Sequence, residues 1–181
     1  MPPLAVKTIE DLIYWQYAKI ISESAGFGKG NYRFIMDRFK KLQAGEIEWS
    51  SSIREWIRER ENPDNCIYCG ATVKLTVEHM IPLSRGGPDH SDNAVLVCSH
   101  CNSLKGDKRL YEFFSLEQRN EIPRIAEGKY LKLLYTELGK RDLLRISKEN
   151  ISELCDICDL EVKCPVPEDM TVYCLEGVFT K

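Results

Sequence analysis

The sequence predicts an α+β protein in which a small unit held by four cysteines lies between helical segments. Within that unit the residues favour a short strand around 74–81, a second strand at 94–98 and a helix from about 99. Outside the unit, apolar residues recur at the three- and four-residue spacing of amphipathic helices. The four cysteines form two Cys-x-x-Cys pairs, which are Cys66 with Cys69 and Cys98 with Cys101.

Helical support is expected on the N-terminal side of the unit. Helices are predicted over 8–25, 31–43 and 52–61. The first begins at Thr8, and Asp11 stands three residues later, as at a capped helix start. These helices indicate a scaffold and no particular chemistry.

On the C-terminal side, helical spacing returns within 116–145, where Pro123 is expected to divide two helical stretches. The end of the chain is rich in cysteine and proline. The organisation predicted from these patterns is a helical N-terminal region at 1–61, a core at 62–112, a helical region at 113–150 and a cysteine-rich tail at 151–181.

The composition is that of a soluble globular protein, with 43% hydrophobic and 29% charged residues in a chain of 181. No run of about 20 apolar residues could span a bilayer, and the N-terminus lacks the basic and apolar regions of a signal peptide. We therefore expect a cytoplasmic protein without a membrane partner. The net charge of −3 gives no general attraction to nucleic acid, although a bound cation and a local basic strip can still attract a phosphate.

All eight cysteines fall into two clusters, and none lies in the N-terminal third of the chain. In a reducing cytosol, clustered Cys-x-x-Cys pairs are typical of metal ligands rather than of disulfides. The thiolates of the first cluster can converge on one tetrahedral structural Zn²⁺. The long segment between the two pairs indicates that something further is built inside this zinc unit.

The inserted segment carries the residues with catalytic potential. Glu78 and His79 are neighbours on the first predicted strand, so their side chains point to opposite faces unless the backbone bends. Asn102 follows the last cysteine of the unit. A carboxylate and an amide oxygen form a minimal pair for a hard ion such as Mg²⁺, which keeps several waters. His79 is then free to act as a general base toward an attacking water.

Taken in order, the motifs C-x-x-C, E-H-x-I-P-x-S-x-G-G, N and C-x-x-C-N-x-x-K-G resemble the HNH nucleases, in the McrA-like form that carries four cysteines. The resemblance covers about residues 62–112. It implies a ββα-metal fold, in which a strand pair and a helix surround one catalytic ion. By the family's pattern His79 is the general base, Asn93 holds the loop and orients that histidine, and Asn102 is a metal ligand.

Two departures from the family's common pattern bear on the metal. The last position of the pattern is often histidine, and Asn102 makes this the HNN form. A site with oxygen ligands alone favours Mg²⁺ or Mn²⁺ over zinc. Glu78 stands where aspartate is frequent and reaches one methylene further, which changes the metal geometry to be expected.

Basic residues around the site are candidates for phosphate contacts, and these are Arg85, Lys105, Lys108 and Arg109. Lys105 and Lys108 lie three residues apart and can share a helix face, although Asp107 dilutes their charge. For Lys108 and Arg109 a solvated helix face is an equal alternative. The remaining histidines, His90 and His100, are expected to be exposed.

The cysteines of the tail allow a second, compact zinc site, whose ligands are Cys155, Cys158, Cys164 and Cys174. The alternative is a loose tail with free thiols, which Pro165 and Pro167 suit. A second zinc ion would pin the tail to the helices and could present a surface for DNA or a protein partner.

The predicted function is a metal-dependent endonuclease that hydrolyses DNA phosphodiester bonds, with Mg²⁺ or Mn²⁺ as the catalytic ion and one or two structural Zn²⁺ ions. Two alternatives stay open. One is a zinc-stabilised module that binds nucleic acid or protein without catalysis, and the other is a nuclease effector that needs an activating protein partner. A single active site per chain makes double-strand cleavage easiest in a homodimer with twofold symmetry.

Overall fold

The computed structural model describes residues 2–48, 64–166 and 169–180, and the third predicted helix, at 52–61, lies outside them. The helices are α1 (Ile9–Ser24), α2 (Tyr32–Gln43), α5 (Ser99–Lys105), α6 (Leu110–Phe114), α7 (Arg124–Lys140) and α8 (Ser152–Cys155), and the strands are β1 (Leu75–His79) and β2 (Ala94–Cys98). Short 3₁₀ turns cover Leu83–Arg85, Lys148–Asn150, Glu161–Lys163 and Val172–Leu175.

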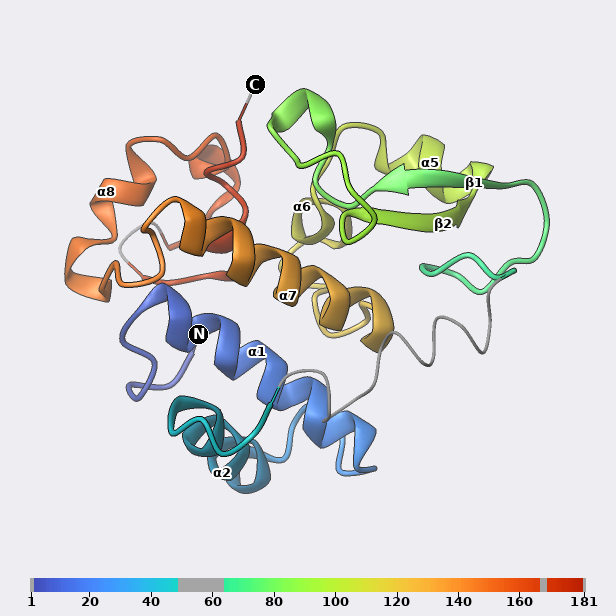
Figure 1. Cartoon of the computed structure of the whole chain (residues 1–181). Helices are drawn as coiled ribbons and strands as arrows, with labels where there is room; N and C mark the ends of the chain where they lie inside the picture. Colours follow the sequence, from blue (N-terminus) through green and yellow to red (C-terminus); the bar gives the residue numbers. More distant parts are fainter. Residues whose placement is uncertain (1, 49–63, 167–168, 181) are drawn as a thin grey trace.

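Helix α7 crosses the middle of the molecule, with α1 and α2 on one side of it and the two strands on the other (Figure 1). Helix α8 and the turns of the tail gather at the end of the molecule away from the strands (Figure 1). Within the described ranges, no helix is both long enough and apolar enough to cross a membrane.

Helix α1 begins as the sequence predicts. Thr8 Oγ1 accepts a hydrogen bond from the backbone N–H of Asp11 at 3.1 Å, and the Asp11 carboxylate accepts one from the N–H of Thr8 at 3.2 Å. This reciprocal pair satisfies two N–H groups that the first turn leaves without helical acceptors. The second predicted helix is also present as α2, which Asn31 caps through a hydrogen bond from the N–H of Phe34 at 3.2 Å.

Helix α7 differs from the prediction of two helical stretches. Residues 116–122 form turns, and Pro123 precedes one continuous helix instead of dividing two. Proline suits a helix start because the first N–H groups of a helix have no helical acceptor in any case. Helix α7 packs beside α1, where the rings of Tyr14 and Tyr135 stack with their centroids 6.0 Å apart.

Strands β1 and β2 form an antiparallel pair whose register places Leu75 opposite Cys98 and His79 opposite Ala94. Helix α5 begins at the residue after β2 and packs against both strands. This order confirms the predicted strands and helix, although the first strand ends at His79. Lys129 of α7 donates a hydrogen bond to the carbonyl of Ala94 at 2.9 Å, so the central helix also holds the second strand.

The loop between the strands turns back on its own beginning. The N–H of Gly87 donates to the carbonyl of Pro82 at 3.1 Å. A Cβ atom at Gly87 would lie 2.1 Å from the carbonyl oxygen of Ile81, which no side chain tolerates. Glycine is therefore required at this position for the loop to close.

The tail closes over α6 through one buried carboxylate. Glu176 accepts hydrogen bonds from the N–H groups of Tyr111 at 3.0 Å and of Glu112 at 2.6 Å. It also accepts one from the hydroxyl of Tyr130 on α7 at 2.7 Å. Two of these donors belong to the first turn of α6, which offers no helical acceptor for them. An acid of the tail thus caps a helix that lies far earlier in the chain.

Burial of Glu176 makes the stability of the protein depend on pH. Burial raises the pKa of Glu176 to about 7, against the opposing effect of its donors, from an ordinary value of 4.5. Because folding raises its pKa, the protonated carboxyl of Glu176 stabilises the folded state fully at pH values below 4.5. This stabilisation is lost as the pH rises through 7.

Glu176→Gln should remove this titration. We expect the free energy of unfolding of the wild type, relative to that of the variant, to fall by about 3 kcal/mol as the pH rises from 4.5 to 7. The variant should also be less stable than the wild type at acidic pH, because an amide nitrogen cannot accept from the α6 donors. Urea unfolding of both proteins across this range measures the difference, and a constant difference would contradict the raised pKa.

Candidate functional site

The four cysteines of the predicted zinc unit come together beside the strand pair. All four Sγ atoms lie within 4.8 Å of one another, and the Sγ atoms of Cys69 and Cys98 are 3.7 Å apart. Zinc–thiolate bonds of about 2.3 Å place the sulfur atoms of a tetrahedron about 3.8 Å apart. The separations therefore fit a structural zinc ion, with Cys66 and Cys101 as the other two ligands.

Backbone contacts hold these thiols in position. Cys98 is the N-cap of α5, and its Sγ accepts a hydrogen bond from the N–H of Cys101 at 3.4 Å. That hydrogen bond is the main reason that the pKa of Cys98 is lowered to about 7, which favours the thiolate form that zinc binds. In the other pair, the N–H of Gly70 donates to the carbonyl of Cys66 at 2.8 Å and turns the chain sharply.

Glu78 points from β1 into the protein. Its side chain is only 6% exposed and forms an ion pair with the ammonium group of Lys105 on α5. The hydroxyl of Tyr68 donates to the same carboxylate at 3.0 Å. Lys105 Nζ also donates to the carbonyl of His79 at 3.1 Å. Burial lowers the pKa of Lys105, although the charge of Glu78 opposes that effect. Helix α5 therefore places a cation against the carboxylate that the sequence assigns to a metal.

His79 follows Glu78 in the strand and is more exposed, at 27% of its side chain, as the alternation of a strand requires. Its Nε2 atom lies 3.4 Å from Oδ1 of Asp89, which belongs to the loop between the strands. Asp89 is itself 83% exposed, so its carboxylate places a negative charge beside the imidazole without fixing the tautomer.

Asn93 is fully buried and joins the two ends of the loop between the strands. Its Oδ1 accepts from the N–H of Ile81 at 2.8 Å, and its Nδ2 donates to the carbonyls of Ile81 and Pro88, both at 2.8 Å. The loop thus begins two residues after His79 in a position that Asn93 fixes. These contacts are of the kind that the predicted loop-holding role requires.

Asn102 lies in α5, directly after the zinc cysteine Cys101, and is partly exposed. Among the described residues, no hydrogen-bond partner takes its side-chain amide. Lys105 stands three residues later on the same helix, and residues at this spacing share a helix face. Because Lys105 contacts Glu78, Asn102 faces the same side of the strand pair one turn earlier.

The basic strip predicted around the site is wrong for Lys105 and Arg109, because both side chains are 0% exposed. Arg109 donates to the carbonyls of Glu176 at 3.2 Å and Phe179 at 2.8 Å. Its other terminal nitrogen lies 2.7 Å from Oδ1 of Asp159. The two cations neutralise carboxylates and satisfy carbonyls inside the fold, so neither offers its charge to a phosphate.

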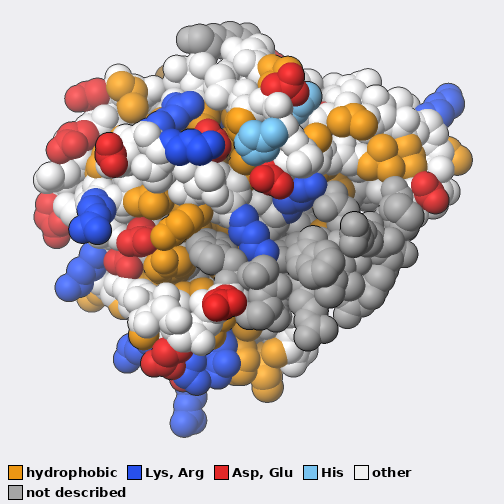
Figure 2. Space-filling model, viewed as in Figure 1, with side chains coloured by type: hydrophobic (Ala, Val, Ile, Leu, Met, Phe, Trp, Pro, Cys, Tyr) orange, Lys and Arg blue, Asp and Glu red, His pale blue; other side chains and the backbone are white. Residues whose placement is uncertain are grey.

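The other two basic candidates differ from each other. Arg85 is 11% exposed, donates to the carbonyl of Asp107 at 2.7 Å and lies 2.5 Å from the carboxylate of Asp159. Lys108 is exposed, and its Nζ lies 3.4 Å from the carbonyl of Leu104. Lys108 is thus the candidate whose charge is most available. In the view of Figure 2, basic and acidic side chains are interspersed around the histidines, which gives that face a mixed charge.

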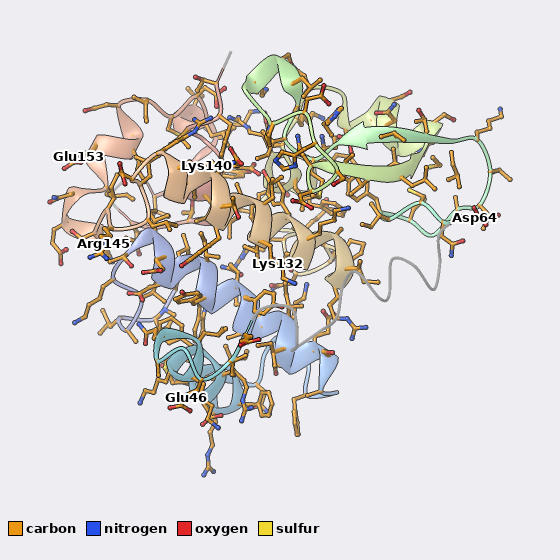
Figure 3. All side chains as sticks on the ribbon, in the orientation of Figure 1. Glu46, Asp64, Lys132, Lys140, Arg145 and Glu153 are labelled. Atoms are coloured by element: carbon orange, nitrogen blue, oxygen red, sulfur yellow. The ribbon has the colours of Figure 1, made fainter. Side chains whose placement is uncertain are left out.

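The two remaining histidines lie at the surface, as predicted. His90 is 40% exposed, and its Nε2 lies 4.0 Å from Oε1 of Glu137 on α7. The same carboxylate oxygen binds Lys140 at 2.7 Å, a residue labelled on α7 in Figure 3. His100 lies on α5 between Cys98 and Cys101 and is exposed.

The cysteines of the tail form a group of their own. Cys155, Cys158, Cys164 and Cys174 all line one pocket beside α8. The sulfur atoms of the first cluster lie within 4.8 Å of one another, whereas those of the tail do not.

Three contacts of the site were absent from the sequence-based prediction. Tyr68 and Lys105 both bind Glu78, and Asp89 lies beside His79. The position of Tyr68 between two zinc ligands was a usable signal, since any residue there is held near the site. Lys105 is the lysine of the motif C-x-x-C-N-x-x-K-G, which marks it as part of the site without naming its partner, and nothing in the spacing of Asp89 distinguishes it from a solvated charge.

An antiparallel strand pair, the helix that follows it and a four-thiol cluster of the size that fits zinc define the ββα class of nuclease fold. The family described as HNH endonuclease matches residues 66–108, the segment that contains all of these features. This region of the chain belongs to the HNH endonuclease family.

A relative of this chain is the "Type IV methyl-directed restriction enzyme EcoKMcrA" of Escherichia coli (strain K12). The two sequences are 26% identical over 103 residues, which cover 51% of this chain and 35% of that enzyme. The chain thus spans about a third of the length of its relative. No solved structure matches the chain significantly.

Proposed function

We propose that this protein is a metal-dependent endonuclease that hydrolyses phosphodiester bonds of DNA. The observation that carries the proposal is the contact of Lys105 with Glu78 and with the carbonyl of His79. This contact packs α5 against the acid–histidine pair at the end of β1, and the spacing of Asn102 and Lys105 on α5 supports Asn102 as a residue of the same helix face. The four-cysteine cluster clamps the start of the same helix.

Glu78 and Asn102 would hold the divalent ion, through a carboxylate oxygen and an amide oxygen. The ammonium group of Lys105 occupies a cation position against the buried carboxylate of Glu78, and a divalent ion there would have to replace it. Oxygen ligands of this kind suit Mg²⁺ or Mn²⁺. When bound, the ion would supply Lewis-acid stabilisation of the charge that develops on the phosphate.

His79 would act as the general base. Asp89 lies beside the imidazole, and a ring nitrogen of His79 takes a proton from the attacking water. The water oxygen forms the new bond to phosphorus, and the bond to the 3′ oxygen breaks, which leaves a 5′ phosphate and a 3′ hydroxyl. Asn93 fixes the loop that carries Asp89, so the orientation of His79 depends on Asn93 through that loop. Lys108 is the basic residue proposed to contact the DNA backbone.

The substrate and the assembly are part of the same proposal. The relative is described as methyl-directed, so methylated DNA is a substrate to test beside unmethylated DNA. A homodimer would supply two active sites for cleavage of both strands. We assign the nuclease core to residues 62–112, supported by the helical regions at 1–61 and 113–150 and by the tail at 151–181.

The test is cleavage of supercoiled plasmid, methylated and unmethylated, in Mg²⁺, in Mn²⁺ and with EDTA. We expect the wild type to cleave in both metals and EDTA to abolish cleavage. Asn102→Ala should require at least about tenfold more Mg²⁺ for half-maximal rate, because one protein oxygen is lost from the ion. Ser103→Ala, at the next and exposed position of α5, is the matched control and should follow the wild-type curve. An unchanged curve for Asn102→Ala would place the ion elsewhere.

A second candidate is a zinc-stabilised module that binds nucleic acid without catalysis. One observation favours it, since Lys105 neutralises the carboxylate that a catalytic ion would need. This candidate predicts that the protein binds DNA with the same affinity in Mg²⁺ and in EDTA, and that neither plasmid is cut. Both candidates allow His79→Ala to bind DNA, so that result does not distinguish them. Cleavage by the wild type distinguishes them, because only the nuclease cuts DNA.

A further inference from the structure

The tail brings its four cysteines to one pocket. Cys155 ends α8, Cys158 follows it after two residues, and Cys164 and Cys174 come from later turns of the tail, yet all four line the same cavity. Apolar and aromatic residues of the tail, Leu154, Tyr173 and Val178, complete its wall. Leu154 and Tyr173 are themselves buried, so the pocket is part of the packed structure and not a gap between loose loops.

Backbone N–H groups point at two of these thiols. The N–H of Leu160 donates to Sγ of Cys158 at 3.4 Å, and the N–H of Thr171 donates to Sγ of Cys174 at 3.5 Å. The bond from Cys101 to Sγ of Cys98 in the first cluster has the same length, 3.4 Å. Burial raises the pKa of both thiols, and these donors oppose that effect by stabilising the thiolate, which is the form that binds metal.

Gly177 is shaped to receive the thiol of Cys158. A Cβ atom at Gly177 would lie 2.2 Å from Sγ of Cys158 and 3.0 Å from the carbonyl oxygen of Tyr173. The N–H of Asp159 donates to the carbonyl of Gly177 at 3.4 Å, and this hydrogen bond holds the two segments of the tail together. Any side chain at Gly177 would push the thiol of Cys158 out of its position.

The thiols are the groups of the pocket that are available to bind a metal ion, because the carboxylate beside them is paired with a lysine. Asp169 also lines the pocket, but its carboxylate lies 2.7 Å from Nζ of Lys148. Arg109 lies 2.7 Å from Asp159, the residue after Cys158, and brings a buried positive charge close to that thiol. A cation with four thiolate ligands carries net negative charge, and this arginine would offset part of it.

We propose that Cys155, Cys158, Cys164 and Cys174 form a second structural zinc site that fastens the tail. The sulfur atoms lie further apart than those of the first cluster, so the other side chains would rotate toward the thiol of Cys158, which stays in place beside Gly177. Each thiol releases its proton to solvent when it becomes a zinc ligand. Because Glu176 caps α6, a zinc ion that orders the tail also holds that capping residue in place. The inference is independent of whether the protein cleaves DNA.

The test is the zinc content of the full-length protein, purified with a thiol reductant and measured by elemental analysis. The wild type should contain two zinc ions per chain and Gly177→Ala one. Gly30→Ala is the matched control, since a Cβ atom there meets nothing within 4 Å, and it should keep both ions. Cobalt-substituted wild type should show the visible bands of tetrahedral thiolate coordination at twice the intensity per chain of Gly177→Ala.

A second measurement on the wild type guards against a variant that fails to fold. The native protein is treated with iodoacetamide, and the modified cysteines are mapped by mass spectrometry. We expect the four cysteines of the tail to resist alkylation until a chelator is added. One zinc ion per chain in the wild type, with the tail thiols alkylated at once or joined as a disulfide, would overturn the proposal.

Discussion

His79→Ala should slow the cleavage of plasmid DNA by about 10²–10⁴-fold, the usual contribution of a positioned general base. The variant lacks the nitrogen that would take the proton from the attacking water, and hydroxide would have to form without help. Its fold should be unchanged, because His79 is partly exposed and its side chain supports no packed element. The measurement is the rate of loss of supercoiled plasmid in Mg²⁺ with enzyme in excess, together with the zinc content and the melting temperature.

The matched control for this variant is His90→Ala. His90 is also a partly exposed histidine beside an aspartate, with Nδ1 3.9 Å from Asp92, yet it is assigned no part in the chemistry. It should cleave at the wild-type rate. Added imidazole should restore part of the activity of His79→Ala and leave His90→Ala unaffected. If His79→Ala kept more than about a tenth of the wild-type rate, His79 would not be the base.

Cys66→Ser should unfold the nuclease core and remove one zinc ion per chain. Structural zinc contributes roughly 10–16 kcal/mol to the folding of small peptides near pH 7, which is as large as the whole stability of an ordinary domain. The strand pair and the short helix α5 offer little apolar core to replace it. Hydrogen exchange read by mass spectrometry should show that amides of β2 (Ala94–Cys98) are protected in the wild type and exchange freely in the variant.

The control for Cys66→Ser is His100→Ala. His100 lies between Cys98 and Cys101 and is exposed, so it shares the knuckle without belonging to the thiol cluster. It should keep its zinc, and its β2 amides should stay protected. A Cys66→Ser protein that holds as much zinc as the wild type and protects the same amides would refute a structural role for the cluster.

The strand pair, the helix after it and the thiol cluster could be predicted because they depend on local signals. β-branched residues favour β2, and the Cys-x-x-Cys spacing fixes where the chain must turn. The cap of α1 was readable for the same reason, since Thr8 and Asp11 are three residues apart. Each signal lies among neighbouring residues, and the requirement of four ligands for one ion then brings the two Cys-x-x-Cys pairs together.

The burial of the charged residues could not be predicted from local signals. Arg109 and Lys105 look like surface cations until the partners that bury them are known, and those partners are Glu78, Asp159 and carbonyls of the tail. These contacts join residues from distant parts of the chain. Pro123 misled the prediction for a different reason, because a proline that starts a helix and one that breaks a helix have the same neighbours.

The hydrogen bonds from Tyr111 and Glu112 to Glu176 set an order of events during synthesis. Chains are made at about 5–20 residues per second, and segments fold as they leave the ribosome. While the residues near 176 are still inside it, the first turn of α6 has no acceptor for these N–H groups, and Arg109 lacks its carbonyl partners. The cap of α6 and the buried contacts of Arg109 are therefore among the last contacts that the chain can form as it is made.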